Sequence, residues 1–375
     1  MEPNGRVPRG RRVIHCRLPL TWTECRARFE LAAREAGATV TRHPIAARGP
    51  DQQQLGVDSL LLGAASPRRA LVVMSGVHGV EGFVGSAIQT DLLRRLEPRS
   101  LPPDMAVLML HAVNPWGMAW SRRQNESNVD LNRNWRRSVT LPTRNDAYDE
   151  LHALACPDSA ELPSLEDLMN SVFALVRSRG VGWVRDGITL GQYRHPDGLH
   201  FGGERTEEST AIVEGLVRDR LRVVERLLTI DLHTGHGPRG TLTLLSDQPS
   251  ESAQTRFLAR LGVGTVEATA GNPEATTGLK SGQIANGLAG LFPNADCVSS
   301  SAEFGTVPDA EQLSATFLEH WVHRHGNRAD PAHAEIVWRY RCCFTPDDRS
   351  WESRSLEQGA ALLDASLDAV ASWDR

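Results

Sequence analysis

His78 and Glu81 are the first residues along the chain whose types and spacing suggest chemistry. They lie three positions apart in a glycine-containing turn that follows the apolar run 70–74 and precedes a helix-like stretch from Gly82. An imidazole and a carboxylate are both ligands of catalytic zinc, which typically takes three protein ligands and a water molecule. The pair is weak evidence by itself, because a turn histidine beside a helix-capping glutamate is the commoner arrangement.

Two later strand-like runs end in the same kinds of side chain. The run 227–232 leads directly into His233, and the run 297–302 leads directly into Glu303. In an open α/β sheet, ligands bind in the crevice outside the carboxyl ends of the strands. We therefore expect these side chains to lie at one edge of the sheet together with the turn after 70–74.

Taken together, these side chains predict a metal site. His78, Glu81 and His233 make a set of two imidazoles and one carboxylate with an open fourth position. Glu303 is a further glutamate that can take a proton from a metal-activated water. Asp231 lies two residues before His233, and its role stays open. Each histidine taken alone favours a structural imidazole, whereas the set favours the metal.

The elements that must position these residues alternate along the chain between strand-like and helix-like patterns, which is typical of an α/β protein. Strands are predicted at 39–41, 60–62, 70–74, 105–110, 227–233, 241–245 and 297–302. Helices are predicted at 22–36, 82–96, 145–155, 164–177, 207–226, 252–261, 309–324 and 355–373. Glycine and proline predict loops at 111–117, 180–203 and 271–293.

One polar segment stands out between these elements. Residues 120–137 are rich in arginine and asparagine, too polar for a core and too specific in composition for a spacer. Polar loops held over a rigid sheet are where binding residues concentrate. This segment is therefore a candidate for substrate recognition.

Charge and composition exclude several partners. The net charge is −5, and residues of both signs are spread along the 375-residue chain, so neither a nucleic acid nor a membrane surface is an expected partner. No apolar run approaches the roughly 18 residues that a membrane helix needs.

The N-terminus and the cysteines indicate the compartment. Residues 1–12 are basic but are not followed by an apolar stretch, so they do not form a secretory signal. The six cysteines show no C-x-x-C spacing and are typical of reduced thiols, which predicts a cytoplasmic protein.

Five motifs in this order resemble the zinc carboxypeptidase superfamily, which includes the aspartoacylase and succinylglutamate desuccinylase branch. The similarity runs from about Trp22 to the C-terminus, and the sequences at 75–82 and 128–134 are most similar to the DUF2817 proteins. The motifs are His78-x-x-Glu81, Asn114-Pro115-x-Gly117, Asp130-Leu131-Asn132-Arg133-Asn134, Asp231-Leu232-His233 and Glu303.

The resemblance implies roles for the candidate metal ligands and for Glu303. His78, Glu81 and His233 match the three ligands of one zinc ion per chain. Glu303 matches the glutamate that activates the water and passes its proton to the leaving amine.

The resemblance also implies substrate-binding residues in the polar segment and the loop after it. Asn132 and Arg133 match the pair that holds a substrate carboxylate, a task that suits a planar guanidinium. Arg123, or its neighbour Arg122, matches the arginine that stabilises the oxyanion. The spacing from Arg123 to Asn132 departs from that of the well-known branches, and a pair of surface charges is the alternative for the two arginines. Tyr193 is the nearest candidate for the tyrosine that closes over substrate.

The sequence therefore predicts an α/β protein with a mixed open β-sheet and helices on both faces. Residues 21–375 are expected to form a single zinc-carboxypeptidase-like domain after a poorly ordered N-terminal extension, 1–20. The expected activity is hydrolysis of an amide bond next to a free carboxylate, in a peptide or an N-acyl amino acid. An amidase or esterase without the carboxylate requirement is the alternative enzyme, and a metal-free binding protein on the same scaffold is the alternative outside enzymes.

Overall fold

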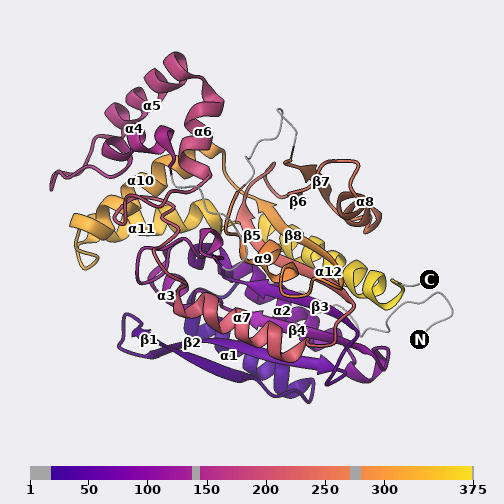
Figure 1. Ribbon diagram of the computed structural model, residues 1–375. Helices are drawn as coiled ribbons and strands as arrows, with labels where there is room; N and C mark the ends of the chain where they lie inside the picture. Colours follow the sequence, from indigo (N-terminus) through magenta and orange to yellow (C-terminus); the bar gives the residue numbers. More distant parts are fainter. Residues whose placement is uncertain (1–17, 137–143, 271–279, 374–375) are drawn as a thin grey trace.

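An eight-stranded sheet runs through the molecule, in the order β1-β2-β4-β3-β5-β8-β6-β7 (Figure 1). The computed structural model describes residues 18–136, 144–270 and 280–373. The strands are β1 (Thr41–Arg48), β2 (Gln54–Gly63), β3 (Arg69–Ser75), β4 (Met105–His111), β5 (Arg226–Gly235), β6 (Leu242–Ser246), β7 (Thr265–Ala268) and β8 (Asp296–Gly305).

The sheet is mixed, with a parallel centre. The pairs β4–β3, β3–β5 and β5–β8 are parallel, as is the edge pair β6–β7, whereas the pairs β1–β2, β2–β4 and β8–β6 are antiparallel. The central strands read as continuous apolar runs because helices cover both of their faces. Their carboxyl ends therefore meet at one edge, as the sequence predicts.

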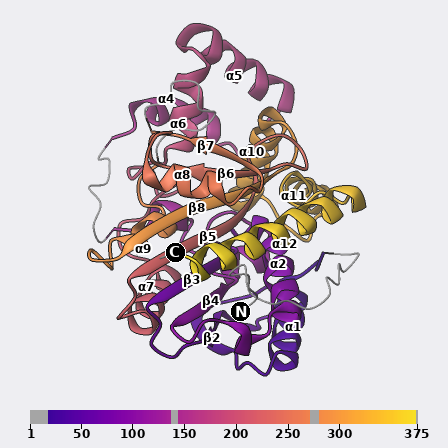
Figure 2. The same ribbon diagram turned by 90° about the vertical axis from the view of Figure 1, so that its right-hand side faces the viewer.

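Each face of the sheet has its own apolar core. One core packs the sheet against α1 (Trp22–Glu35), α2 (Gly82–Arg95), α8 (Ala253–Arg260) and α12 (Arg349–Ala371), the last of which crosses this face in Figure 2. The other core packs it against α7 (Glu208–Arg220) and α9 (Ile284–Ala289). The prediction of a mixed open sheet with helices on both faces is confirmed.

A third apolar cluster lies apart from the sheet. It joins α4 (Asp146–Ala155), α5 (Leu165–Arg179) and α6 (Val181–Thr189) to Phe317 of α10 (Asp309–His325). These helices form a group at one end of the molecule, next to α11 (Pro331–Phe344) (Figure 1).

The three predicted loops each contain a short helix, so these expectations are wrong in part. The loop 111–117 contains the start of α3 (Pro115–Trp120), because Pro115 occupies the first helical turn, where its missing N–H costs nothing. The loop 180–203 contains α6, and the loop 271–293, of which residues 271–279 lie outside the described part, contains α9. Gly180, at φ +92°, ends α5 and starts α6 without a linker, which helical periodicity alone does not reveal.

Several boundaries also differ from the sequence prediction. The helix predicted at 207–226 ends at Arg220, because the chain turns before β5 begins at Arg226. The strand predicted at 39–41 overlaps β1 at Thr41 alone, because β1 runs from Thr41 to Arg48, and β2 is longer than predicted. The elements β7 and α11 were not predicted. Three one-turn 3-10 helices complete the fold: η1 (Gly79–Glu81), η2 (Pro98–Ser100) and η3 (Leu131–Arg133). The N-terminal extension expected at 1–20 falls mostly outside the described residues, and Leu18 packs into the first core.

Candidate metal centre

The turn after β3 brings the first two candidate ligands to the carboxyl edge of the sheet. His78 precedes η1, and Glu81 is the last residue of η1. The turn requires Gly79, because a side chain there would collide with the backbone of Gly117 in α3. His233 lies near the carboxyl end of β5, which pairs directly with β3, so the sheet itself sets its distance from the turn.

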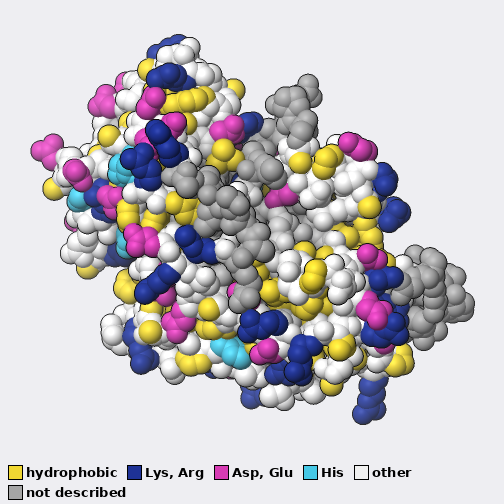
Figure 3. Space-filling model, viewed as in Figure 1, with side chains coloured by type: hydrophobic (Ala, Val, Ile, Leu, Met, Phe, Trp, Pro, Cys, Tyr) yellow, Lys and Arg dark blue, Asp and Glu magenta, His cyan; other side chains and the backbone are white. Residues whose placement is uncertain are grey.

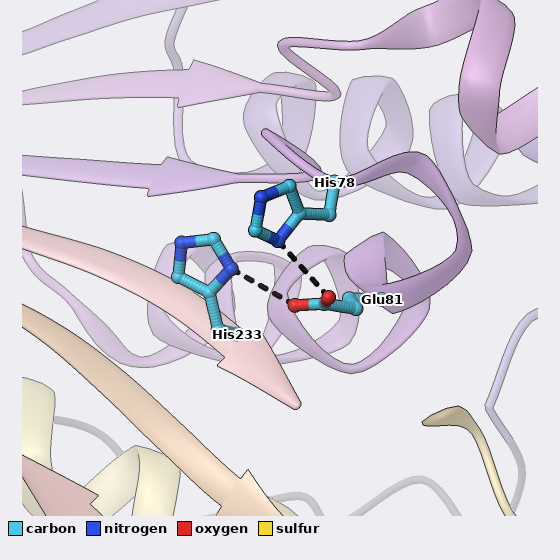
Figure 4. A group of neighbouring side chains, drawn as sticks. All are labelled: His78, Glu81 and His233. Carbon is cyan, nitrogen blue, oxygen red and sulfur yellow. Dashed lines mark hydrogen bonds and ion pairs between the residues drawn. The ribbon is translucent and has the colours of Figure 1, made fainter. Parts of the chain in front are cut away.

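Both imidazoles turn the same nitrogen toward one carboxylate (Figure 4). Nδ1 of His78 lies 3.0 Å from Glu81 Oε1, and Nδ1 of His233 lies 2.9 Å from Glu81 Oε2. The ring centroids are 4.7 Å apart, and one potential ligand atom from each residue lies within 4.8 Å of the other two. All three side chains are buried.

The other nitrogen of each imidazole contacts an aspartate. His78 Nε2 lies 3.1 Å from Asp130 Oδ1, and His233 Nε2 lies 2.7 Å from Asp231 Oδ2. Carboxylates thus flank both nitrogens of each ring, and a neutral imidazole carries only one N–H. With that proton on Nε2 and donated to the aspartate, the lone pair of Nδ1 faces Glu81 and can bind a cation. Metal-bound histidines are oriented in this way, with the far N–H donated to a carboxylate.

These residues fit a zinc ion. Nδ1 of His78 is buried and has no hydrogen-bond partner among the described residues, although it faces Glu81. Two lone pairs and a carboxylate converging in a buried space repel one another unless a cation or protons lie between them. Two imidazole nitrogens and a carboxylate are also a ligand set that catalytic zinc takes.

The charges around Glu81 also favour a cation at this centre. Burial raises the pKa of Glu81, but His78, His233 and Arg123 together hold this pKa well below its usual range. Burial lowers the pKa of His233, but Asp231 and Glu81 raise it well above its usual range. Positive charge is therefore favoured between the imidazoles and Glu81.

The side chains of the neighbouring residues Arg122 and Arg123 belong to two different networks. Arg123 lies at the candidate centre, where NH1 donates to Glu81 Oε1 at 2.7 Å and Nε donates to Asp130 Oδ2 at 3.1 Å. Arg122 is buried in another network and forms an ion pair with Glu319 at 3.2 Å. Of the two residues expected near the oxyanion, Arg123 is therefore the one beside the candidate ligands.

Asn132 and Arg133 lie in η3, and the structure gives them different surroundings. Asn132 Nδ2 lies 3.4 Å from His233 Nε2. The buried Arg133 donates to three backbone carbonyls: Nε to Leu190 at 3.1 Å, NH1 to Asn132 at 2.9 Å, and NH2 to Thr189. Since a guanidinium has five N–H groups, two remain beyond these three bonds.

Glu303 lies beside His233 in the sheet. The two residues are register partners in the parallel pair of β5 and β8, so their side chains share one face. Glu303 is nearly buried, and the backbone N–H of His236 lies 3.5 Å from its Oε2. It is outside the group of three ligand atoms, next to the imidazole that belongs to that group.

Tyr193 packs against η3 from the loop after α6. Its hydroxyl donates to the carbonyl of Arg133 at 2.7 Å, and the guanidinium of Arg136 lies 5.8 Å from its ring centroid. Burial raises the pKa of Tyr193 to about 12. The hydroxyl is thus engaged with the backbone, and the expected contact with substrate stays a prediction.

Sequence reasoning missed part of the surroundings of the ligands. Asp130 was quoted only as part of a motif, yet it contacts His78, Arg123 and, at 3.2 Å, Nδ1 of His200. The sequence carries no signal for His200, since its contact spans 70 residues of chain. Asp231 had a usable signal, because residues two apart on a strand lie on the same face.

A second group of potential ligands lies in the helical cluster. His152, Cys156 and Asp197 each offer one atom within 4.8 Å of the others. Arg324 already supplies a positive charge there, with NH1 2.9 Å from Cys156 Sγ and NH2 3.1 Å from Asp197 Oδ2. This cation disfavours a metal ion at the second group.

The fold and the first group define a class: an α/β protein with a His₂Glu metal-type centre at the carboxyl edge of a mixed sheet. A family model described as "Protein of unknown function (DUF2817)" matches residues 20–358. The chain belongs to this family, as its motifs predict. No curated protein matches the sequence.

Solved structures with similar coordinates are distant in sequence. They include the murein-tripeptide amidase MpaA from Escherichia coli O157, with 19% identity, coverage of 78% of this chain and 95% of that one, and a TM-score of 0.41. A succinylglutamate desuccinylase/aspartoacylase from Rhodobacter sphaeroides is 14% identical, with a TM-score of 0.38. The match covers 77% of this chain and 65%, slightly less than two thirds, of that one. A putative metallopeptidase from Shewanella amazonensis has 13% identity, coverage of 80% and 92%, and a TM-score of 0.43.

The surface agrees with the charge pattern of the sequence. Among the described residues of the face in Figure 3, basic and acidic side chains are interspersed. The described helices include none with the length and apolar character needed to span a bilayer.

Proposed function

We propose that this protein is a zinc-dependent hydrolase that cleaves an amide bond next to a free carboxylate, in a peptide or an N-acyl amino acid. The observation that carries the proposal is the convergence of both Nδ1 atoms on Glu81 while each Nε2 contacts an aspartate. This is the arrangement expected of a catalytic His₂Glu centre. The proposal includes one zinc ion per chain, because the residues that the structure describes contain one His₂Glu group.

Zinc held by His78, Glu81 and His233 would supply Lewis-acid chemistry, polarising a carbonyl and making water acidic enough to react at neutral pH. Glu303 is the proposed general base, because its carboxylate lies on the same sheet face as His233. It would accept the proton of the attacking water and pass it to the departing amine nitrogen.

Arg123 is the proposed donor to the oxyanion. Nε and NH1 are fixed by Asp130 and Glu81, which orients the guanidinium beside the candidate ligands. Its NH2 group donates to no acceptor within the part of the chain that the structure describes, so those N–H groups are available to a developing negative charge.

Asn132 and Arg133 are the proposed carboxylate-binding pair. Asn132 reaches His233, and Arg133 has two N–H groups beyond those that bind the backbone. Tyr193 holds the backbone of Arg133 and is proposed to line the same region.

The test is a panel of N-acyl amino acids and short peptides. The rate of hydrolysis is measured for each free acid and, separately, for the matching C-terminal amide, before and after a chelator removes the metal. We expect hydrolysis of free-carboxylate substrates, loss of activity with the chelator, and recovery with zinc. Hydrolysis of the acid and amide forms at equal rates would replace this proposal with an amidase or esterase. Activity that survives complete metal removal would contradict a metal-dependent reaction.

A further inference from the structure

Lys280 is the only lysine in a chain that contains 41 lysine and arginine residues in total. Every other basic residue of these two types is arginine. On a solvated surface the two residues serve alike as positive charges, but an ammonium is a compact, titratable point charge on a flexible stem. At position 280 an arginine would differ from lysine in shape and in titration.

Lys280 begins a segment that is bound to η3, the element that carries Asn132 and Arg133. The carbonyl of Gly282 accepts from the N–H of Trp135 at 2.9 Å, and the N–H of Ile284 donates to Asn132 Oδ1 at 3.1 Å. A side chain at Gly282 would collide with the carbonyl of Arg133, so the two backbones are in contact. Lys280 lies two residues before this contact, and Arg133 is the charged group with the largest effect on its ammonium.

The ammonium of Lys280 lies among charges of both signs. Glu303 in β8 and Asp247 after β6 attract it, whereas Arg133 in η3 and Arg123 repel it. Burial, followed by Arg133, lowers the pKa of Lys280 to about 8. The side chain is half-buried, and among the residues that the structure describes no ion pair or hydrogen bond engages its ammonium.

The neighbouring guanidiniums are held in place by acceptors of their own, although these bonds do not use all of their N–H groups. Arg123 binds Glu81 and Asp130, and Arg133 donates to three backbone carbonyls. Like charges held together in a partly buried place repel one another, and an anion placed between them relieves that repulsion. The region between Arg133 and Lys280 therefore favours a negatively charged group of a ligand.

We propose that Lys280 is a substrate-binding residue whose ammonium pairs with the carboxylate of the substrate, alongside the remaining N–H groups of Arg133. The inference rests on the proposed hydrolase function and names the residue that selects a free carboxylate. A lysine can take this role because its ammonium is a compact charge with three rotatable donors.

Chemical labelling tests binding without using activity. Because the chain has one lysine, an amine-reactive acylating reagent modifies Lys280 and the N-terminal amine alone, and mass spectrometry of the Lys280 peptide gives the rate. The probes are a mixture of N-acetyl amino acids and the matching mixture of their amides, added to the zinc-loaded protein. We expect the acids to slow labelling of Lys280 several-fold and the amides to leave it unchanged. Equal labelling rates with the two mixtures would overturn the proposal.

Kinetics of Lys280→Met and Lys280→Arg give the second measurement. Lys280→Met should raise KM for free-carboxylate substrates at least about tenfold, as expected for loss of a charge-assisted pair. It should leave zinc content and the hydrolysis of amidated substrates nearly unchanged. Arg222→Met, which removes an exposed positive charge, is the matched control. An unchanged KM in Lys280→Met would contradict the assignment.

The pH dependence distinguishes the ammonium from a merely structural side chain. In the wild type, kcat/KM for carboxylate substrates should fall as pH rises through about 8, where Lys280 loses its charge. In Lys280→Arg this fall should be absent, because a guanidinium stays charged. If the wild type hydrolyses no substrate of either kind, the proposed function fails, and the labelling result still decides whether Lys280 binds a carboxylate.

Discussion

Asp231 and His233 lie two residues apart on β5, and Asp231 Oδ2 approaches His233 Nε2 to 2.7 Å. Both side chains are on the same face of the sheet, because side chains alternate along a strand. The aspartate therefore fixes the imidazole so that Nδ1 faces Glu81 at 2.9 Å. A carboxylate in this position orients a metal-binding histidine and makes it a stronger ligand.

Asp231→Asn should weaken zinc binding about 10- to 100-fold, the usual cost of losing such a partner. The amide keeps the size of the side chain but removes the charge that holds His233. Zinc affinity is measured by competition with a chelating indicator. Asp309→Asn, at the exposed start of α10, is the control and should bind zinc like the wild type. An Asp231→Asn protein with wild-type affinity would show that the contact does not support a ligand.

His78→Ala should lose zinc and activity together. It removes one of three proposed ligands, yet the sheet and its two apolar cores do not depend on that side chain. Metal analysis and circular dichroism on the same sample separate the two effects, and we expect a folded protein with little zinc. A variant that retains one zinc ion per chain would remove His78 from the ligand set.

Glu303→Gln should keep zinc and lose turnover, by roughly 10²- to 10⁴-fold in kcat, as is typical when general acid–base catalysis is removed. The amide has the shape of the carboxylate but cannot accept the proton from water. Zinc content and kcat are measured on the same preparation. Loss of zinc in this variant would make Glu303 a ligand and would exchange its role with that of Glu81.

Arg133→Ala should damage hydrolysis of free-carboxylate substrates more than that of their amides. The measured quantity is the ratio of kcat/KM for the two forms in wild type and variant. The free energy of unfolding should also fall, by about 1–3 kcal/mol, because the carbonyls of Leu190, which is half-buried, and of Asn132, which is buried, lose a donor. Equal losses for acid and amide would indicate that Arg133 acts only by holding the backbone.

Lys280 should make stability depend on pH in a defined direction. Its pKa in the folded protein is about 8, below the ordinary value of 10.5, so the folded state binds fewer protons between these two values. The contribution of Lys280 to the free energy of unfolding should therefore rise as pH increases from about 8 to 10.5. Denaturant unfolding of the wild type and Lys280→Met isolates this contribution, since the two differ in one titrating group. A difference that stays constant over this range would contradict the lowered pKa.

The sequence by itself determined the types of elements and the residues at their ends. Apolar runs such as 70–74 and 105–110 are local signals of buried strands, and the structure confirms them as β3 and β4. Histidine and glutamate near the carboxyl ends of such strands are equally local signals, because parallel strands bring these ends to one edge. The group His78, Glu81 and His233 was predicted in this way.

Only the tertiary structure decided which side chains surround that group. Asp130 reaches His78 across 52 residues of chain, and Arg123 rather than its neighbour Arg122 reaches Glu81 across 42. The segment that begins at Lys280 lies against the proposed carboxylate-binding pair, because hydrogen bonds join it to η3 and Trp135. Such contacts depend on how loops from separate elements pack over the sheet edge, and no local periodicity encodes that packing.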